Sequence, residues 1–161
     1  MKSVVRQAPS MSDYCRINEP DVSAEVFETE VLAINLASGH YHSLREAAVP
    51  LWRLLIEGRS VEESASLLAG SLSADPAEVL ADTRALVAAL RERAVIVTVP
   101  APAVGASLPS PAWLGEFKPP YVKPLFDTYT DMKDLLLIDP IHEVDVSGWP
   151  HQPAARTSGT D

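Results

Sequence analysis

The fold is decided by the stretch AEVFETEVLAINLASGHYHS, residues 24–43. Two β-favouring runs, residues 24–27 and 30–35, are separated by two residues, and Gly39 marks a turn before a third run at residues 40–43. Short runs that are separated by turn residues are typical of neighbouring antiparallel strands. The stretch therefore predicts a three-stranded antiparallel sheet.

Three helices are expected after these strands, because three cap residues are each followed, three positions later, by a glutamate that can bind a free amide. The pairs are Ser43 with Glu46, Ser60 with Glu63, and Asp75 with Glu78. Pro76 would then occupy the first helical position, where its missing amide proton breaks no bond. Together with the sheet, these helices predict the α+β class.

The first of these helices is expected over Leu44 to Glu57, with Gly58 as the residue that ends it. It contains Pro50, and proline deep in a helix removes a hydrogen bond. Its regular part could therefore begin at Pro50, with residues 47–49 as an irregular entry. The third helix is the most periodic, with apolar residues on one face.

Composition divides the 161 residues into four parts. Residues 1–15 lack periodicity and predict a flexible N-terminus, and residues 16–98 hold the predicted strands and helices. Residues 99–112 are a linker rich in proline and alanine. Residues 113–161 regain apolar residues without the means to build a second core, so this tail is expected to be largely disordered or ordered by what it binds.

Charge, cysteine content and hydropathy argue against several classes of protein. The formal net charge of −9, with 13 scattered basic residues, argues against a nucleic-acid surface. The single Cys15 cannot form a disulfide within the chain, and neither a signal peptide nor a run of 18 apolar residues is visible. We therefore expect a cytoplasmic protein.

Three ordered motifs carry a family resemblance: Asn35-Leu36-x-x-Gly39-x-Tyr41, then Trp52-x-Leu54-Leu55, then Gly58-Arg59-x-Val61-Glu62-Glu63. In this order they resemble the PqqD family, named for a pyrroloquinoline quinone biosynthesis protein, over residues 17–97. The chain departs from the family at Pro50 and at Ala94, where such domains tend to have glycine before the last strand.

The resemblance implies a RiPP recognition element, a non-catalytic domain that needs no cofactor. Such a domain is a winged helix-turn-helix with a three-stranded sheet and three helices. It binds the leader of a ribosomally made precursor peptide by strand addition, between the third strand and the third helix, and presents it to a modifying enzyme. That enzyme can be a radical SAM enzyme, a lasso-type protease or cyclase, or another maturase. The implied peptide-binding residues are His40, Tyr41, His42, Ser43 and Leu44 on the strand, and Val79, Thr83, Arg84, Val87 and Arg91 on the helix.

The tail resembles the Tyr-x-x-Pro leader signature of lasso-type and related precursors. Proline holds a chain extended, and its apolar neighbours can fill pockets of a groove. The residues concerned are Tyr121, Pro124, Leu125, Tyr129, Asp131, Leu135 and Leu136. The 24 residues from Val97 to Tyr121 give a flexible reach of about 27 Å, so the tail could dock in cis at an effective concentration on the order of millimolar. It would then be either a substrate or a leader mimic.

Other functions fit the residues less well. A winged-helix DNA-binding regulator is the alternative, but the third helix carries more acidic than basic residues and so lacks a basic face. His40 and His42 lack a third ligand at metal-binding spacing. The polar group from Asp139 to Asp145 lacks the second histidine of a zinc protease, and Cys15 has no partner that would make it a nucleophile.

Overall fold

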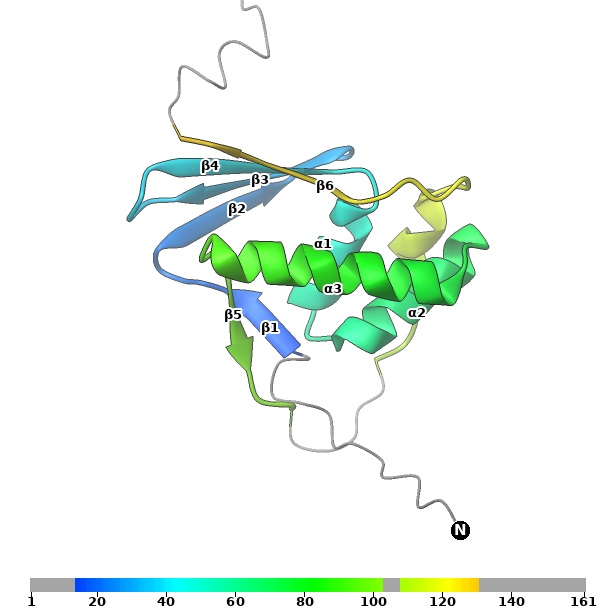
Figure 1. Ribbon diagram of the computed structural model, residues 1–161. Coiled ribbons are helices and arrows are strands. Elements are labelled where there is room, and N and C mark those ends of the chain that lie inside the picture. Colours follow the sequence, from blue (N-terminus) through cyan, green and yellow to red (C-terminus); the bar gives the residue numbers. More distant parts are fainter. Residues whose placement is uncertain (1–13, 103–107, 131–161) are drawn as a thin grey trace, which may run out of the picture.

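The computed structural model of the chain describes residues 14–102 and 108–130 (Figure 1). Its elements run in the order β1 Tyr14–Ile17, β2 Val22–Val26, β3 Glu30–Asn35, β4 His40–Arg45, α1 Ala48–Ile56, α2 Val61–Leu72, α3 Pro76–Glu92, β5 Ile96–Val99, the 3-10 helix η1 Ala112–Glu116, and β6 Leu125–Tyr129. No helix in the described part of the chain is long and apolar enough to cross a membrane.

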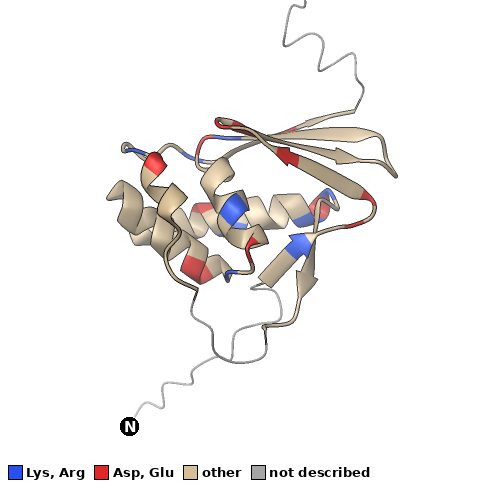
Figure 2. Ribbon diagram, turned by 180° about the vertical axis from the view of Figure 1, so that it is seen from behind, with Lys and Arg blue, Asp and Glu red and all other residues tan. Residues whose placement is uncertain are grey.

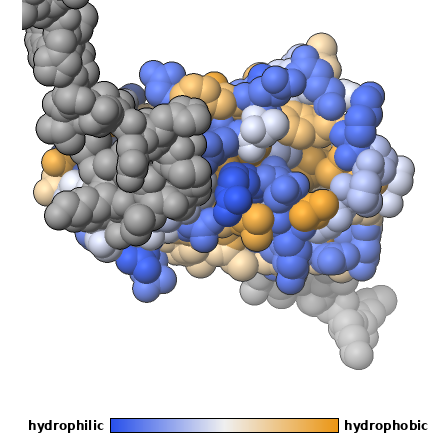
Figure 3. Space-filling model, turned by 90° about the horizontal axis from the view of Figure 1, so that it is seen from above, coloured by the Kyte–Doolittle hydropathy of each residue, from blue (hydrophilic) through white to orange (hydrophobic). Residues whose placement is uncertain are grey.

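The main sheet is antiparallel and has the strand order β2-β3-β4-β6. On β3 the side chains of Val31, Ala33 and Asn35 are buried, while the residues between them are partly exposed. This alternation places one face of the sheet over the helices and leaves the other face open. Figure 3 views the molecule from above and shows apolar residues in patches between hydrophilic ones on the coloured part of the surface.

The predicted strand number is wrong, because the sheet has four strands and β1 pairs with β5 in a separate ribbon. The fourth strand, β6, comes from the tail, about 80 residues after its partner β4. Local sequence patterns identify strands but not distant pairing partners, so the predicted strand count omitted β6, although the family resemblance implied strand addition beside the third strand. Residues 131–161 of the predicted disordered tail lie outside the described residues.

Two of the three predicted caps are confirmed. The Ser60 side chain accepts a hydrogen bond from the Glu63 amide at 3.0 Å, and Asp75 accepts one from Ala77 at 3.1 Å, with Pro76 at the start of α3. Both side chains satisfy amides that a first turn leaves free.

The cap at Ser43 and the helix start at Leu44 are wrong. Both residues belong to β4, and the Ser43 hydroxyl donates to Glu30 on β3. The chain turns at Glu46, with φ of 56°, and α1 begins at Ala48. Pro50 therefore falls in the first turn, where a backbone amide has no helical acceptor, and it disturbs no helical hydrogen bond.

The core lies between the sheet and the three helices. Its largest fully buried side chains include Leu44 from β4, Leu51 and Leu54 from α1, Leu68 from α2, and Leu90 from α3. The segment after β5 adds to this core, because Leu114 on η1 is only 4% exposed. The tail therefore packs on the core of the domain instead of forming one of its own.

Candidate functional site

The edge of β4 is the candidate site, because a segment far along the chain pairs with it. β6 runs antiparallel to β4, and five residue pairs join Tyr41 through Arg45 to Tyr129 through Leu125. Figure 1 shows β6 crossing above α3 along the near edge of the sheet. Four of the five predicted strand residues, Tyr41 to Leu44, lie in this ladder, and His40 begins the same strand.

His42 and Leu44 face the core side of the sheet, opposite Thr128 and Phe126. The His42 Nδ1 lies 3.1 Å from the Thr128 hydroxyl, and its ring stacks on Phe126 with centroids 5.5 Å apart. The ring is only 1% exposed, and its Nε2 has no hydrogen-bond partner in the described part of the chain. Burial, with smaller contributions from the charges of His40 and Arg93, lowers the pKa of His42 to about 4.

On the open face of the sheet, Arg45 and Asp127 form an ion pair at 2.7 Å. Both side chains are nearly half exposed, so water and salt weaken their attraction. The hydrogen bond to Asp127 is the main cause that raises the pKa of Arg45. This pair adds a side-chain contact to the main-chain ladder, between the last residue of β4 and the middle of β6.

Before β6, the tail is held by α3 and by the entry to α1. The Tyr121 hydroxyl donates to Asp82 at 2.8 Å, and Lys123 Nζ lies 3.5 Å from the other carboxylate oxygen. The Ala47 amide donates to the Val122 carbonyl at 3.3 Å. Burial first, and then the hydrogen bond to Asp82, raises the pKa of Tyr121, so this phenol stays a donor.

The predicted residues of α3 divide into two groups. Val79, Thr83 and Val87 are buried, and the Thr83 hydroxyl donates to the Val79 carbonyl at 2.6 Å. Arg84 instead lies on the surface and pairs with Glu62 of α2 at 3.2 Å. Asp82 of α3 contacts the tail through its carboxylate, whereas the candidates expected from the sequence were Arg84 and Arg91.

The predicted leader-like residues that the structure describes lie along one path. Tyr121 contacts α3, Pro124 is partly buried just before β6, and Leu125 and Tyr129 are the ends of β6. Leu125 is 41% exposed. The other three, Asp131, Leu135 and Leu136, lie outside the described residues.

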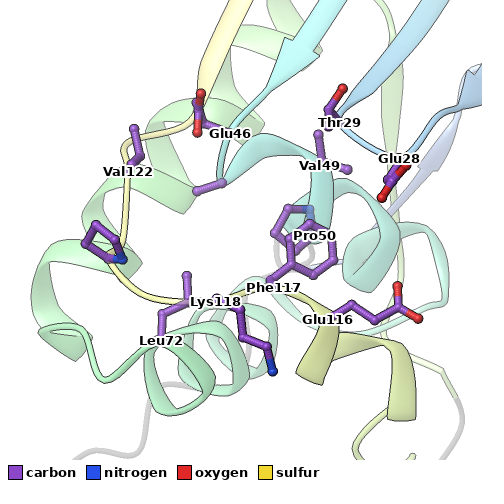
Figure 4. Close-up of a pocket in the computed structure, with 12 residues that line it drawn as sticks. Glu28, Thr29, Glu46, Val49, Pro50, Leu72, Glu116, Phe117, Lys118 and Val122 are labelled. Atoms are coloured by element: carbon purple, nitrogen blue, oxygen red, sulfur yellow. The ribbon is translucent and has the colours of Figure 1, made fainter.

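A pocket of about 380 Å³ opens between the tail and the domain (Figure 4). The tail side is formed by residues such as Phe117, Lys118 and Val122, and the domain side by residues such as Glu46 and Pro50. The pocket is a product of docking, because one of its walls is the docked tail itself.

The other chemistry considered from the sequence has little support. The described residues hold no group of three potential metal ligands. Burial raises the pKa of the Cys15 thiol to about 11, which disfavours the reactive thiolate. Figure 2 shows basic and acidic residues interspersed on the side that it views, without a cluster of basic ones.

Several contact residues were not expected from the sequence. Phe126, Thr128 and Asp127 carry the side-chain contacts of β6, and Asp82 and Arg45 receive the tail. A signal was available for β6, since Leu125 to Tyr129 is rich in aromatic residues directly after a proline. The sequence did not mark Asp82 or Arg45 as contacts, because charged residues are common on helices and edge strands.

Comparison with known proteins gives a family and a solved structure. Residues 30–96, from β3 to the start of β5, match the family described as Coenzyme PQQ synthesis protein D (PqqD). The structure described as "TbiB1 in Complex with the TbiA(beta) Leader Peptide" has 27% sequence identity and a TM-score of 0.47, and the comparison covers 50% of this chain and 93% of that chain. No curated protein matches the chain.

Proposed function

We propose that this chain, in which residues 30–96 form a PqqD-family domain, is a non-catalytic RiPP recognition element that binds a leader peptide and presents it to a modifying enzyme. In this proposal the leader adds as a strand to the edge of β4, beside α3. The α2–α3 pair and the sheet would serve as a winged helix-turn-helix that has been adapted to peptide.

The observation that carries the proposal is the pairing of β6 with β4. An extended peptide that joins a sheet edge gains affinity from main-chain hydrogen bonds and selectivity from alternate side chains. Phe126 on the buried face and Tyr121 at Asp82 are the side chains that would provide this selectivity. Binding of this kind uses hydrogen bonds and apolar burial, so it calls for no cofactor.

The occupant of the site belongs to the same chain, which supports a leader or leader mimic in cis. A tethered segment competes at an effective concentration on the order of millimolar, so free peptides of similar intrinsic affinity would be largely excluded. The residues beyond β6 would then be the part offered to a modifying enzyme. We propose that this enzyme is one of the maturases that PqqD-type domains serve, acting in the cytoplasm.

A peptide exchange experiment tests this function in the full chain. Phe126→Asp places a carboxylate opposite the buried Leu44 and should release β6 without altering the domain. A labelled synthetic peptide of residues 118–130 should then bind this variant saturably, and bind the unaltered chain at least 100-fold more weakly.

The matched control is the same peptide carrying Phe126→Asp, which should bind neither chain. The proposal is wrong if the unaltered peptide fails to bind a Phe126→Asp chain whose circular dichroism shows a native fold.

A further inference from the structure

A second contact between tail and domain lies away from β4, on the surface made by α1 and α2. Residues 108–117 run across this surface before the chain reaches Tyr121. We call this surface the α1–α2 face and define it by Arg53, Glu57, Arg59 and Ser71. The four residues of the α1–α2 face lie within residues 30–96, which match the PqqD family, whereas the segment that they contact, residues 108–117, lies outside that range.

Arg59 is the centre of this contact. Its side chain is only 3% exposed, yet it donates to the carbonyls of Leu108 at 3.2 Å and Pro109 at 2.6 Å. It also pairs with Glu63 at 2.9 Å and, more loosely, with Glu57 at 3.4 Å. A buried guanidinium requires several acceptors, and here two of them are main-chain carbonyls of the bound segment.

The side chains after Pro109 anchor the segment more specifically. The Trp113 indole donates to Glu57 at 2.9 Å, and the Arg53 guanidinium lies 3.8 Å from the centre of the Trp113 ring. Leu114 inserts into the core, and its carbonyl accepts from the Ser71 hydroxyl at 3.3 Å. A cation on an indole face and an aliphatic side chain in a pocket are contacts that select particular residues.

The backbone of the segment suits this kind of recognition. Residues 108–111 read Leu-Pro-Ser-Pro, and Pro111 has φ of −73° and ψ of 137°, which are polyproline II angles. Proline-rich segments in this conformation lose little entropy on binding and dock against aromatic or charged surfaces. The 3-10 turn of η1 then presents Trp113 and Leu114 side by side.

We propose that the α1–α2 face is a second peptide-binding site, which recognises a proline-led Trp-Leu segment upstream of the leader-like strand. The inference rests on the proposed function and adds a basis for substrate choice. A peptide that carries both segments engages two sites at once, and such bivalent binding exceeds that of either segment alone. The domain therefore selects its own tail, or a precursor built in the same way, over leaders that carry the strand motif alone.

The test compares two synthetic peptides, residues 118–130 and residues 108–130. The receptor is the full chain with Trp113→Ala, Leu114→Ala and Phe126→Asp, whose own tail should be loose at both sites. On this receptor the longer peptide should bind at least 10-fold more tightly than the shorter one. On the Phe126→Asp chain, whose own Trp113 and Leu114 still fill the α1–α2 face, the two peptides should bind equally.

A peptide-side variant removes any effect of receptor folding. The longer peptide with Trp113→Ala and Leu114→Ala should lose its advantage and bind like the shorter one. Equal affinities of the unaltered long and short peptides on the triple variant would overturn the second site while leaving the β4 site intact. Failure of the short peptide on the Phe126→Asp chain would instead contradict the proposed function itself, so the two failures are distinguishable.

Discussion

The Asp82 carboxylate on α3 accepts a 2.8 Å hydrogen bond from the Tyr121 hydroxyl on the tail. The Asp82 side chain is only 13% exposed, so this carboxylate depends on its partners more than a surface carboxylate would. Lys123, which is mostly exposed, adds a second and weaker contact at 3.5 Å. A tyrosine two residues before a lysine is thus recognised by one side chain of α3.

Tyr121→Phe should weaken docking of the tail, because it leaves the Asp82 carboxylate without its phenol donor. Loss of a hydrogen bond to a charged group costs about 1.5–3 kcal/mol, so a peptide of residues 118–130 with this change should bind the Phe126→Asp chain at least 10-fold more weakly. Fluorescence anisotropy of the labelled peptides measures the difference.

A double-mutant cycle with Asp82→Asn is the control for this prediction. If the hydrogen bond is responsible, tyrosine and phenylalanine peptides should differ much less on the Asp82→Asn receptor. An equal loss on both receptors would mean that the hydroxyl acts elsewhere and that Asp82 is not its partner.

Much of the domain follows from local sequence patterns. The β-favouring runs at residues 24–43 became β2, β3 and β4, and the caps at Ser60 and Asp75 begin α2 and α3. These features depend on residues close together in the chain. The Ser43–Glu46 pair shows the limit of such patterns, since the same spacing at the end of a strand caps nothing.

The tail contacts could be placed only in part. The family resemblance predicts a Tyr-x-x-Pro segment near β4, but it does not predict that Asp82 binds Tyr121. Arg59 was part of a family motif, but arginine is seldom buried, and nothing local indicated that it would hold carbonyls about 50 residues away. Contacts of this kind depend on how distant segments meet in the fold, which local patterns in a single sequence do not show.

Stability should fall as the pH is lowered from about 6.5 to about 4, because His42 binds a proton more readily in the unfolded chain than in the folded one. Its folded pKa is lowered, so its contribution is complete above the unfolded value near 6.5 and is lost as the pH approaches 4. The lowered pKa of His42 corresponds to a change of at most about 3 kcal/mol in the free energy of unfolding. Thermal unfolding measured across this range checks the slope.

Carboxylates also titrate in this range, so the comparison must be made with a matched variant. His42→Gln keeps a polar group beside Thr128 but has no proton to gain. Its unfolding temperature should fall less steeply with pH than that of the unaltered chain. Parallel curves for the two proteins would show that His42 does not cause the pH dependence.

Ala94→Gly should stabilise the domain. Ala94 has φ of 55°, in the left-handed region where a β-carbon is strained. Relief of the strain should exceed the extra backbone entropy of glycine in the unfolded chain, for a net gain of about 0.5–1 kcal/mol. Urea unfolding measures the gain.

The matched control for Ala94 is the same exchange where the backbone is helical. Ala85 lies exposed within α3, so Ala85→Gly should destabilise the domain by about 1 kcal/mol. If Ala94→Gly raises the free energy of unfolding and Ala85→Gly lowers it, the difference is caused by the backbone conformation at the two positions. Destabilisation at both positions would contradict the strain at Ala94.

Docking of β6 should depend little on salt, although an ion pair lies at its edge. Arg45 and Asp127 are each nearly half exposed, and such pairs contribute about 0–1 kcal/mol. Arg45→Ala should therefore change the affinity of the Phe126→Asp chain for the 118–130 peptide by less than about 5-fold. The main-chain ladder and the buried Phe126 contact should carry most of the binding. Affinities for this peptide measured at 50 and 500 mM salt should also differ by less than about 5-fold. If high salt instead weakened binding strongly, and Arg45→Ala removed this salt dependence, the ion pair would be the principal contact.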